Sequence, residues 1–301
     1  MGIRKSGNSF KNNDENFDMN ENISSNSRKD KFLAFKKLHQ KGNCFVIPNA
    51  WDAGSTKILT ELGFPAIATT SAGYAYSMGI RDATASLTRN EILKNAMSIV
   101  EATALPVSAD LEDGFGSTPQ DCFQTIKEAI STGLVGGSIE DATGNADSPI
   151  FEFDLAVERV TAAAQAAKNG HFLLTARSEN FLYGRNDIDD TISRLQAFEK
   201  AGADVLYAPG LPDLESIRLV CASVTKPVNI VMGLSGSLYD LRDLQNAGVT
   251  RISVGGSFYR AAMGAFVRAA KEVINQGSFS YSNEALQDKV ISKIMKDKKR
   301  I

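Results

Sequence analysis

Pro106-Val-Ser-Ala-Asp-Leu-Glu-Asp-Gly-Phe-Gly116 is a β-rich segment that ends in acids and glycines. Side chains two residues apart on an extended strand point to the same side, so Asp110 and Glu112 are predicted to face one pocket. Carboxylates this close repel each other and raise each other's pKa unless a cation lies between them. With no Cys or His nearby, such an oxygen-only cluster suits Mg²⁺, and Mn²⁺ as a second choice. The segment therefore predicts a strand that ends in a metal site.

Similar β-rich segments recur along the rest of the chain. Amphipathic stretches of helix length separate them, and glycines mark several helix ends. The segments cover residues 44–52, 66–71, 106–112, 137–141, 172–178, 204–208, 227–232 and 251–255, and the helical stretches include 89–103, 121–132, 154–169, 189–201 and 214–224. Neither GxGxxG nor a P-loop follows the first segment, so the pattern predicts an α/β fold of the (β/α)₈ TIM-barrel type rather than a doubly wound sheet.

Such barrels carry their chemistry where the strands end, at the carboxyl-terminal face. Asp82, Asp110, Glu112 and Glu140 all fall at or just after predicted strand ends. The sequence therefore predicts that four carboxylates from neighbouring units meet at the mouth of the barrel.

Composition narrows the class of protein. A chain of 301 residues with 43% hydrophobic residues accommodates a single barrel, predicted over residues 30–301 with helices at its C-terminal end. A net charge of -2 gives no electrostatic footprint for nucleic acid. The three cysteines, Cys44, Cys122 and Cys221, are widely spaced, which predicts free thiols and a cytoplasmic location. No apolar segment approaches the length of a membrane span.

Residues 1–29 differ in composition from the rest of the chain. They are rich in Asn, Ser, Lys and acidic residues and contain few hydrophobic side chains that could be buried. They are predicted to form a disordered arm. The segment from Met1 to Ser6 matches the loose pattern for N-myristoylation of Gly2. Membrane contact is expected only if Gly2 is acylated.

Six ordered motifs together resemble the isocitrate lyase and phosphoenolpyruvate mutase superfamily, from about residue 40 to about residue 275. The resemblance implies Mg²⁺ held directly by Asp110, with Asp82, Glu112 and Glu140 acting mostly through water. It also implies that Arg177 binds the anionic end of a small carboxylate or phosphonate substrate, and that the protein is a homotetramer. A turn is implied to receive a substrate carboxylate, formed by Thr70, Ser71, Ala72 and Gly73. The motifs are Asn49–Asp52, Thr69–Tyr74, Ser77–Asp82, Asp110–Gly116, Gly136–Asp141 and Thr175–Glu179.

The chain departs from this pattern after the fourth strand. Carbon–carbon lyases of the superfamily carry a catalytic Cys there, and the mutase and phosphonopyruvate hydrolase branches carry a Lys and an Asn. Residues 140–151 contain no Cys, Lys or His, and only Asn145 could match. Tyr74, Tyr76 and Arg185 remain alternative sources of an acid or an anion contact.

These motifs predict a Mg²⁺-dependent enzyme that acts on a 2-oxo acid or enol phosphate through an enolate, with Asp82, Arg177 and Asn145 as catalytic residues. Phosphorus–carbon chemistry of the mutase or phosphonopyruvate hydrolase type is the first expectation. A lyase of the methylisocitrate or dimethylmalate type is the alternative. A barrel that binds such an acid without turnover is the second alternative.

Several of these residues also have a structural interpretation. Arg177 could pair with Glu179, Asp82 could pair with Arg81, and Asp52 is as well suited to cap a helix. The glycines of residues 233–237 and 255–256 could bind phosphate or simply form turns. His39 and His171 lie outside the motifs and are interpreted as surface or packing residues.

Overall fold

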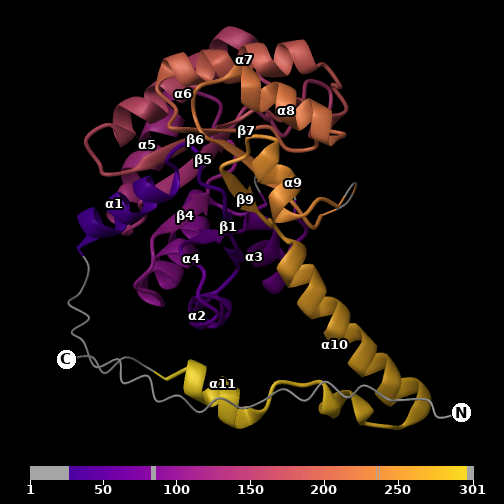
Figure 1. Cartoon of the computed structure of the whole chain (residues 1–301). Coiled ribbons are helices and arrows are strands. Elements are labelled where there is room, and N and C mark those ends of the chain that lie inside the picture. Colours follow the sequence, from indigo (N-terminus) through magenta and orange to yellow (C-terminus); the bar gives the residue numbers. More distant parts are fainter. Residues whose placement is uncertain (1–26, 83–85, 235, 237, 297–301) are drawn as a thin grey trace, which may run out of the picture.

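Nine parallel strands form a nearly closed barrel surrounded by helices in the computed structural model, which describes residues 27–82, 86–234, 236 and 238–296 (Figure 1). The sheet order is β1-β9-β8-β7-β6-β5-β4-β3-β2, and each pair of neighbours is parallel. The strands are β1 (Phe45–Ile47), β2 (Asn49–Ala50), β3 (Ile67–Thr69), β4 (Val107–Asp110), β5 (Gly136–Glu140), β6 (Leu173–Arg177), β7 (Val205–Tyr207), β8 (Val228–Val231) and β9 (Arg251–Ser253). The predicted TIM-barrel class is confirmed.

The first predicted strand is divided in two at Pro48. β1 pairs with β9 on one side, and β2 pairs with β3 on the other. Proline has no N–H to donate to a neighbouring strand, but the Pro48 carbonyl still accepts from the Ala68 N–H at 2.8 Å. The eight predicted β-segments therefore become nine strands. The two halves of the first segment, β1 and β2, lie at the two edges of the sheet.

Helices alternate with the strands and begin where the sequence supplies caps. The Thr118 side chain accepts from the Asp121 N–H, and Pro119 occupies the first turn of its helix. The helices are α1 (Arg28–Leu38), α2 (Ala53–Glu61), α3 (Ser71–Ser77), α4 (Arg89–Glu101), α5 (Pro119–Ser131), α6 (Phe153–Ala167), η1 (Asn180–Tyr183), α7 (Ile188–Ala201), α8 (Leu214–Ser223), α9 (Leu241–Asn246), α10 (Ser257–Gln276), η2 (Ser280–Asn283) and α11 (Asp288–Ile294).

Helix α1 covers the amino-terminal end of the barrel. Its Phe35 is fully buried among residues at or next to the first positions of several strands, including Phe45, Val135 and Leu173. Ser27 caps the helix, so residues 27–29 of the predicted arm belong to α1 and its cap. The rest of the predicted arm, residues 1–26 with Gly2, lies outside the described residues.

Helix α10 projects away from the barrel, and the chain then returns so that α11 packs near α2 (Figure 1). None of the residues of α10 is buried, although the helix carries Met263, Phe266, Val267 and Ile274. The Lys57 ammonium group donates to the Met295 carbonyl at 3.0 Å and ties this extension back to α2. The predicted C-terminal helices are therefore present. Within the described part of the chain, no helix has the length and apolar character needed to cross a membrane.

Candidate active site

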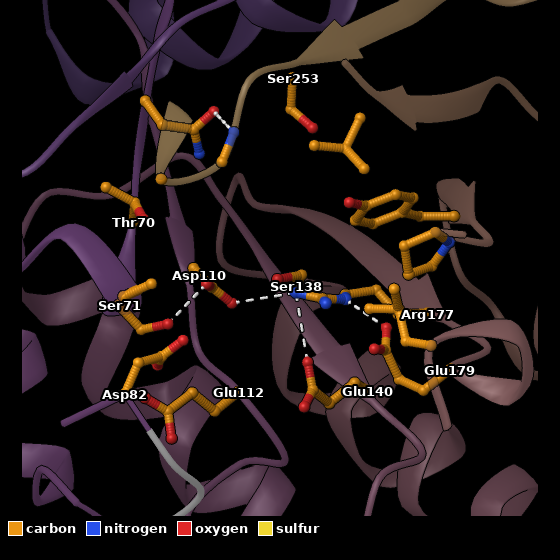
Figure 2. Close-up of a pocket in the computed structure, with 18 of the residues that line it drawn as sticks. Thr70, Ser71, Asp82, Asp110, Glu112, Ser138, Glu140, Arg177, Glu179 and Ser253 are labelled. Atoms are coloured by element: carbon orange, nitrogen blue, oxygen red, sulfur yellow. Dashed lines mark hydrogen bonds and ion pairs between the residues drawn. The ribbon is translucent and has the colours of Figure 1, made fainter. Parts of the chain in front are cut away.

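A cavity of about 950 Å³ opens at the carboxyl-terminal ends of the strands. The predicted site residues that line it are Thr70, Ser71, Ala72, Asp82, Asp110, Glu112, Glu140, Asn145 and Arg177. Figure 2 shows the labelled carboxylates and Arg177 gathered around one space. Gly73 does not line the cavity but is buried within α3, where a Cβ would lie 2.6 Å from the Thr70 methyl group. The structure thus brings together nearly all the residues that the sequence singled out.

The turn after β4 places Asp110 and Glu112, although not in the way the sequence predicted. β4 ends at Asp110, and Glu112 has a left-handed backbone with φ 49°. The shared strand face was therefore wrong as the reason, even though both side chains line the cavity. Gly114 has φ 87°, and a Cβ there would lie 2.9 Å from the sulfur of Cys122, so the turn requires glycine.

Helix α3 begins beside this turn and presents its first residue to Asp110. The Ser71 hydroxyl donates to Asp110 Oδ2 at 2.9 Å. The Asp110 N–H donates to the Thr69 hydroxyl at 2.9 Å, so β3 fixes the backbone of Asp110 and α3 fixes its side chain. The Thr70 hydroxyl caps α3 by accepting from the Gly73 N–H.

Arg177, at the end of β6, lies between three carboxylates. Its Nη1 is 3.2 Å from Asp110 Oδ1 and 3.2 Å from Glu140 Oε2, and its Nε is 2.8 Å from Glu179 Oε1 (Figure 2). Burial alone lowers the pKa of this guanidinium, but the carboxylates more than offset that, so its pKa lies well above the usual value. The pairing with Glu179 and the position in the cavity are therefore both observed for Arg177.

Negative charge nevertheless exceeds positive charge in this cluster. Burial, reinforced by Asp110, raises the pKa of Glu112 to about 8. Burial also raises the pKa of Glu140 well above its usual value, against the opposing effect of Arg177. The pKa of Asp82 is raised by partial burial and by Asp110. Raised carboxyl pKa values indicate a site that favours additional positive charge.

The donor set fits a divalent cation with oxygen ligands. Five carboxylates and the Ser71 hydroxyl line this part of the cavity, and Arg177 forms ion pairs with three of the carboxylates. In the described part of the chain, no three Asp, Glu, His or Cys side chains already converge as a metal site. Mg²⁺ takes few direct protein ligands and keeps several waters, so it does not require such convergence. Asp110 would be the direct ligand, and Asp82, Glu112 and Glu140 would hold its waters.

The loop after β5 forms a small hairpin at the cavity wall. Ala142 and Ile150 form an antiparallel bridge, and the Phe151 N–H donates to the Asp141 carbonyl at 2.8 Å. Asn145 lines the cavity, but its side-chain oxygen accepts from the Asp147 N–H at 3.0 Å. The amide of Asn145 therefore helps to shape its own turn.

A buried ion pair fixes the base of this loop. Arg194 Nη1 lies 3.2 Å from Asp141 Oδ2 and donates to the Phe151 carbonyl at 2.9 Å. The other oxygen of Asp141 accepts from the Glu179 N–H at 2.8 Å, so the Asp141 carboxylate holds both the loop and Glu179, one of the three partners of Arg177.

A row of polar residues on the cavity floor was not predicted. Tyr207, Asn229, Arg251 and Ser253 all line the cavity from the last three strands. Arg251 is 5% exposed, and its partners are neutral: Asn229, Thr175 and His39. Burial lowers the pKa of Arg251 to about 10. One signal in the sequence could have identified Arg251: it is a charged residue at the first position of a buried strand, and charged residues are rarely buried unless they are paired.

The structure shows the contacts of several residues for which the sequence left alternatives. Tyr74 packs against the hydrophobic core, Tyr76 lines the cavity, and Arg185 pairs with Asp190 at 3.5 Å. Asp52 caps α2 through the Ser55 N–H at 2.7 Å. Gly255 and Gly256 line the cavity.

Comparisons with known proteins identify the family and the fold. Residues 35–274 match the model of the phosphoenolpyruvate phosphomutase family. A candidate lyase/mutase from Burkholderia cenocepacia J2315 has a solved structure with a TM-score of 0.87 and 49% identity, covering 90% of this chain and 97% of that one. A solved phosphonopyruvate hydrolase in complex with oxalate and Mg²⁺ has 21% identity and a TM-score of 0.79, covering 88% of this chain and 94% of that one, and so shares the fold.

Two curated relatives are lyases or decarboxylases. The 2-methylisocitrate lyase of Escherichia coli K12 is 28% identical over 80% of this chain and 82% of its own length. Oxaloacetate decarboxylase 1 of Pseudomonas putida W619 is 26% identical over 79% of this chain and 82% of its own length. This chain is thus an enzyme that belongs to the phosphoenolpyruvate mutase and isocitrate lyase superfamily.

Proposed function

We propose that this enzyme uses Mg²⁺ to break or form a bond at C3 of a small 2-oxo acid through an enolate. The observation that supports this most strongly is the excess of carboxylates around Arg177 at the barrel mouth. Mg²⁺ bound there would neutralise the negative charge that develops on the enolate oxygen. Mn²⁺ would serve as a substitute.

The residues of the chain would bind and orient the substrate. Thr70, Ser71 and Ala72 lie at the start of α3, where backbone N–H groups and the Thr70 hydroxyl can donate to a substrate carboxylate. Arg177 would hold the anionic end of the substrate, and its contact with Glu179 fixes the plane of the guanidinium. Asn145 and the hairpin around it would act as a lid that excludes water.

Phosphorus–carbon chemistry on phosphonopyruvate or phosphoenolpyruvate is the first candidate reaction. Arg81 and Arg260 line the cavity in addition to Arg177, and several guanidinium groups suit a phosphonate dianion. The second candidate is carbon–carbon cleavage, including decarboxylation, of a 2-oxo acid such as oxaloacetate. The curated relatives support it, as does the Cys-free loop, because decarboxylation releases neutral CO₂ and needs no acid at that loop.

A panel of substrates tests the proposal. Purified protein would be incubated with Mg²⁺ and phosphonopyruvate, phosphoenolpyruvate, oxaloacetate, methylisocitrate or dimethylmalate, and products followed by ¹H and ³¹P NMR. Turnover of at least one substrate, abolished by excess EDTA and restored by Mg²⁺, is expected. No turnover of any of them, or turnover indifferent to EDTA, would contradict the proposal and would favour a binding protein.

We also propose that the enzyme is a homotetramer and that it is cytoplasmic. The unburied apolar side chains of α10, among them Phe266 and Ile274, support a partner subunit at that helix. Cys44, Cys122 and Cys221 are free thiols, which supports a reducing compartment.

A further inference from the structure

The reaction proposed above leaves the source of one proton open. Cleavage at C3 leaves the electron pair of the broken bond in an enolate, and C3 must then gain a proton to become a methyl or methylene group. The hairpin of residues 142–151 contains no Cys, Lys, His or Tyr, and the side-chain oxygen of Asn145 accepts from the Asp147 N–H within its own turn. The acid must therefore lie elsewhere in the cavity.

The strand register connects the carboxylate cluster to the cavity floor. Glu140 pairs with Arg177, Arg177 with Tyr207, Tyr207 with Asn229, and Asn229 with Arg251 across successive strands. Side chains at paired positions of parallel strands point to the same side, so these five residues form one inward row. Tyr207 is next to Arg177 in that row, and the guanidinium carbon lies 4.9 Å from the centre of its ring.

Hydrogen bonds along this row have a fixed direction. An arginine side chain can only donate, and Arg251 Nε donates to the side-chain oxygen of Asn229 at 2.8 Å. The amide nitrogen of Asn229 must then face Ser253, and it donates to that hydroxyl oxygen at 3.1 Å. The Ser253 hydroxyl therefore keeps its own hydrogen to donate, and its interaction with Tyr207 acts to lower the pKa of that phenol, as a donor to the phenol oxygen does. The phenol hydrogen of Tyr207 is consequently not used by Ser253 and is available to the cavity.

We propose that Tyr207 is the catalytic acid that protonates C3 of the enolate, and that Ser253, Asn229 and Arg251 position its hydroxyl group. The Tyr207 O–H bond breaks as the C3–H bond forms, and water returns a proton to the phenolate. Arg177 beside the ring and the donated Ser253 bond stabilise that phenolate while it lasts. Burial raises the pKa of Tyr207, so the phenol is protonated before each turnover.

This inference rests on the proposed function and makes it more specific. A mutase moves a phosphoryl group from C3 to the enolate oxygen and needs no proton at C3. A built proton donor therefore assigns the chain to net cleavage, as a hydrolase, lyase or decarboxylase, whose product is the protonated 2-oxo acid.

Proton exchange of pyruvate tests Tyr207 without knowledge of the natural substrate. By microscopic reversibility the phenolate of Tyr207 removes a methyl proton from pyruvate, and deuterium from D₂O replaces it, which ¹H NMR follows at about pH 9 with Mg²⁺. The wild-type enzyme is expected to exchange, and Tyr207→Phe is expected to exchange at least about 100-fold more slowly. Tyr281→Phe, which removes an exposed tyrosine hydroxyl on η2 outside the cavity, should stay within about threefold of wild type.

Binding of oxalate, an analogue of the pyruvate enolate, supplies a second readout by calorimetry. Tyr207→Phe should bind oxalate with Mg²⁺ within about threefold of wild type, because the substitution removes a proton donor and not a ligand. If wild type exchanges pyruvate and Tyr207→Phe exchanges it equally fast, the role of Tyr207 is overturned but the proposed function is not. Equal losses in the two tyrosine variants, or lost oxalate binding in Tyr207→Phe, would overturn that role as well. A wild type that neither exchanges pyruvate nor cleaves any 2-oxo acid would overturn the proposed function together with it.

Discussion

Arg251 Nε donates to the side-chain oxygen of Asn229 at 2.8 Å, and this bond determines which end of the Asn229 amide faces Ser253. A buried arginine normally has a carboxylate partner, whereas the partners of Arg251 in the described structure are neutral. Its charge is therefore available to orient a chain of hydrogen bonds that reaches the cavity.

Ser253→Ala tests that orientation. Without the Ser253 hydroxyl, the phenol of Tyr207 loses the bond that directs its hydrogen, so pyruvate exchange should fall about tenfold. Oxalate affinity should not change, and Ser253→Thr, which keeps a hydroxyl, should recover most of the exchange. A loss that Ser253→Thr does not recover would indicate a packing role instead.

Asn145→Ala should lower turnover by about tenfold or less, because Asn145 shapes its own turn and would contribute a positioning contact. Steady-state kinetics on the substrate that the panel identifies would measure this, with Thr143→Ala as a control for a general change in the hairpin. A several-thousand-fold loss with unchanged Mg²⁺ affinity would show that Asn145 takes part in the chemistry and would favour the phosphonate branch.

His39 is predicted to make stability depend on pH. Burial beside Arg251 lowers the pKa of His39 from 6.5 to about 3 in the folded protein. Between those values the unfolded chain binds more protons than the folded one, so the free energy of unfolding decreases as the pH falls below about 6.5. The contribution from this one group approaches about 1.4 kcal/mol per pH unit.

Urea unfolding followed by circular dichroism between about pH 7 and pH 5 would measure this dependence. His39→Gln should have a shallower dependence than wild type, whereas His171→Gln should match wild type. Parallel curves for wild type and His39→Gln would exclude His39 as the cause.

The exposed apolar residues of α10 predict an effect on assembly. Phe266 is 66% exposed in the single chain, and Phe266→Asp should shift the protein from a tetramer to smaller species in light scattering at micromolar concentration. Leu62→Asp, at a site that is 69% exposed on the end of α2, should leave the tetramer intact. A monomeric wild type would rule out the proposed tetramer.

The sequence predicted the order of strands and helices because glycines at helix ends, capping residues and hydrophobic periodicity are local signals. It also located most of the cavity residues, since in a barrel the ends of strands converge. It failed at Glu112, where a left-handed turn depends on Gly114 packing against Cys122. A strand pattern alone does not report such a contact.

The row from Arg177 to Arg251 could not have been predicted in the same way. Tyr207, Asn229 and Arg251 each lie in a strand that the sequence identified, but which of them meet depends on the register between strands. Register is set by how the barrel closes, including the division of the first strand at Pro48, and a single sequence does not contain that information in local form. His39 was interpreted as a surface or packing residue. Its contact with Arg251 depends on how α1 packs against the barrel, which the sequence does not show.

Calorimetric titration of Mg²⁺ in the presence of oxalate tests the central claim most directly. The wild-type chain should bind one Mg²⁺ per subunit, and Asp110→Ala should bind it at least about 100-fold more weakly while unfolding at the temperature of wild type. Glu61→Ala, on the outer helix α2, should bind like wild type. Failure of the wild type to bind Mg²⁺ with oxalate, or equal binding by Asp110→Ala, would contradict the assignment of the barrel-mouth carboxylates as the metal site.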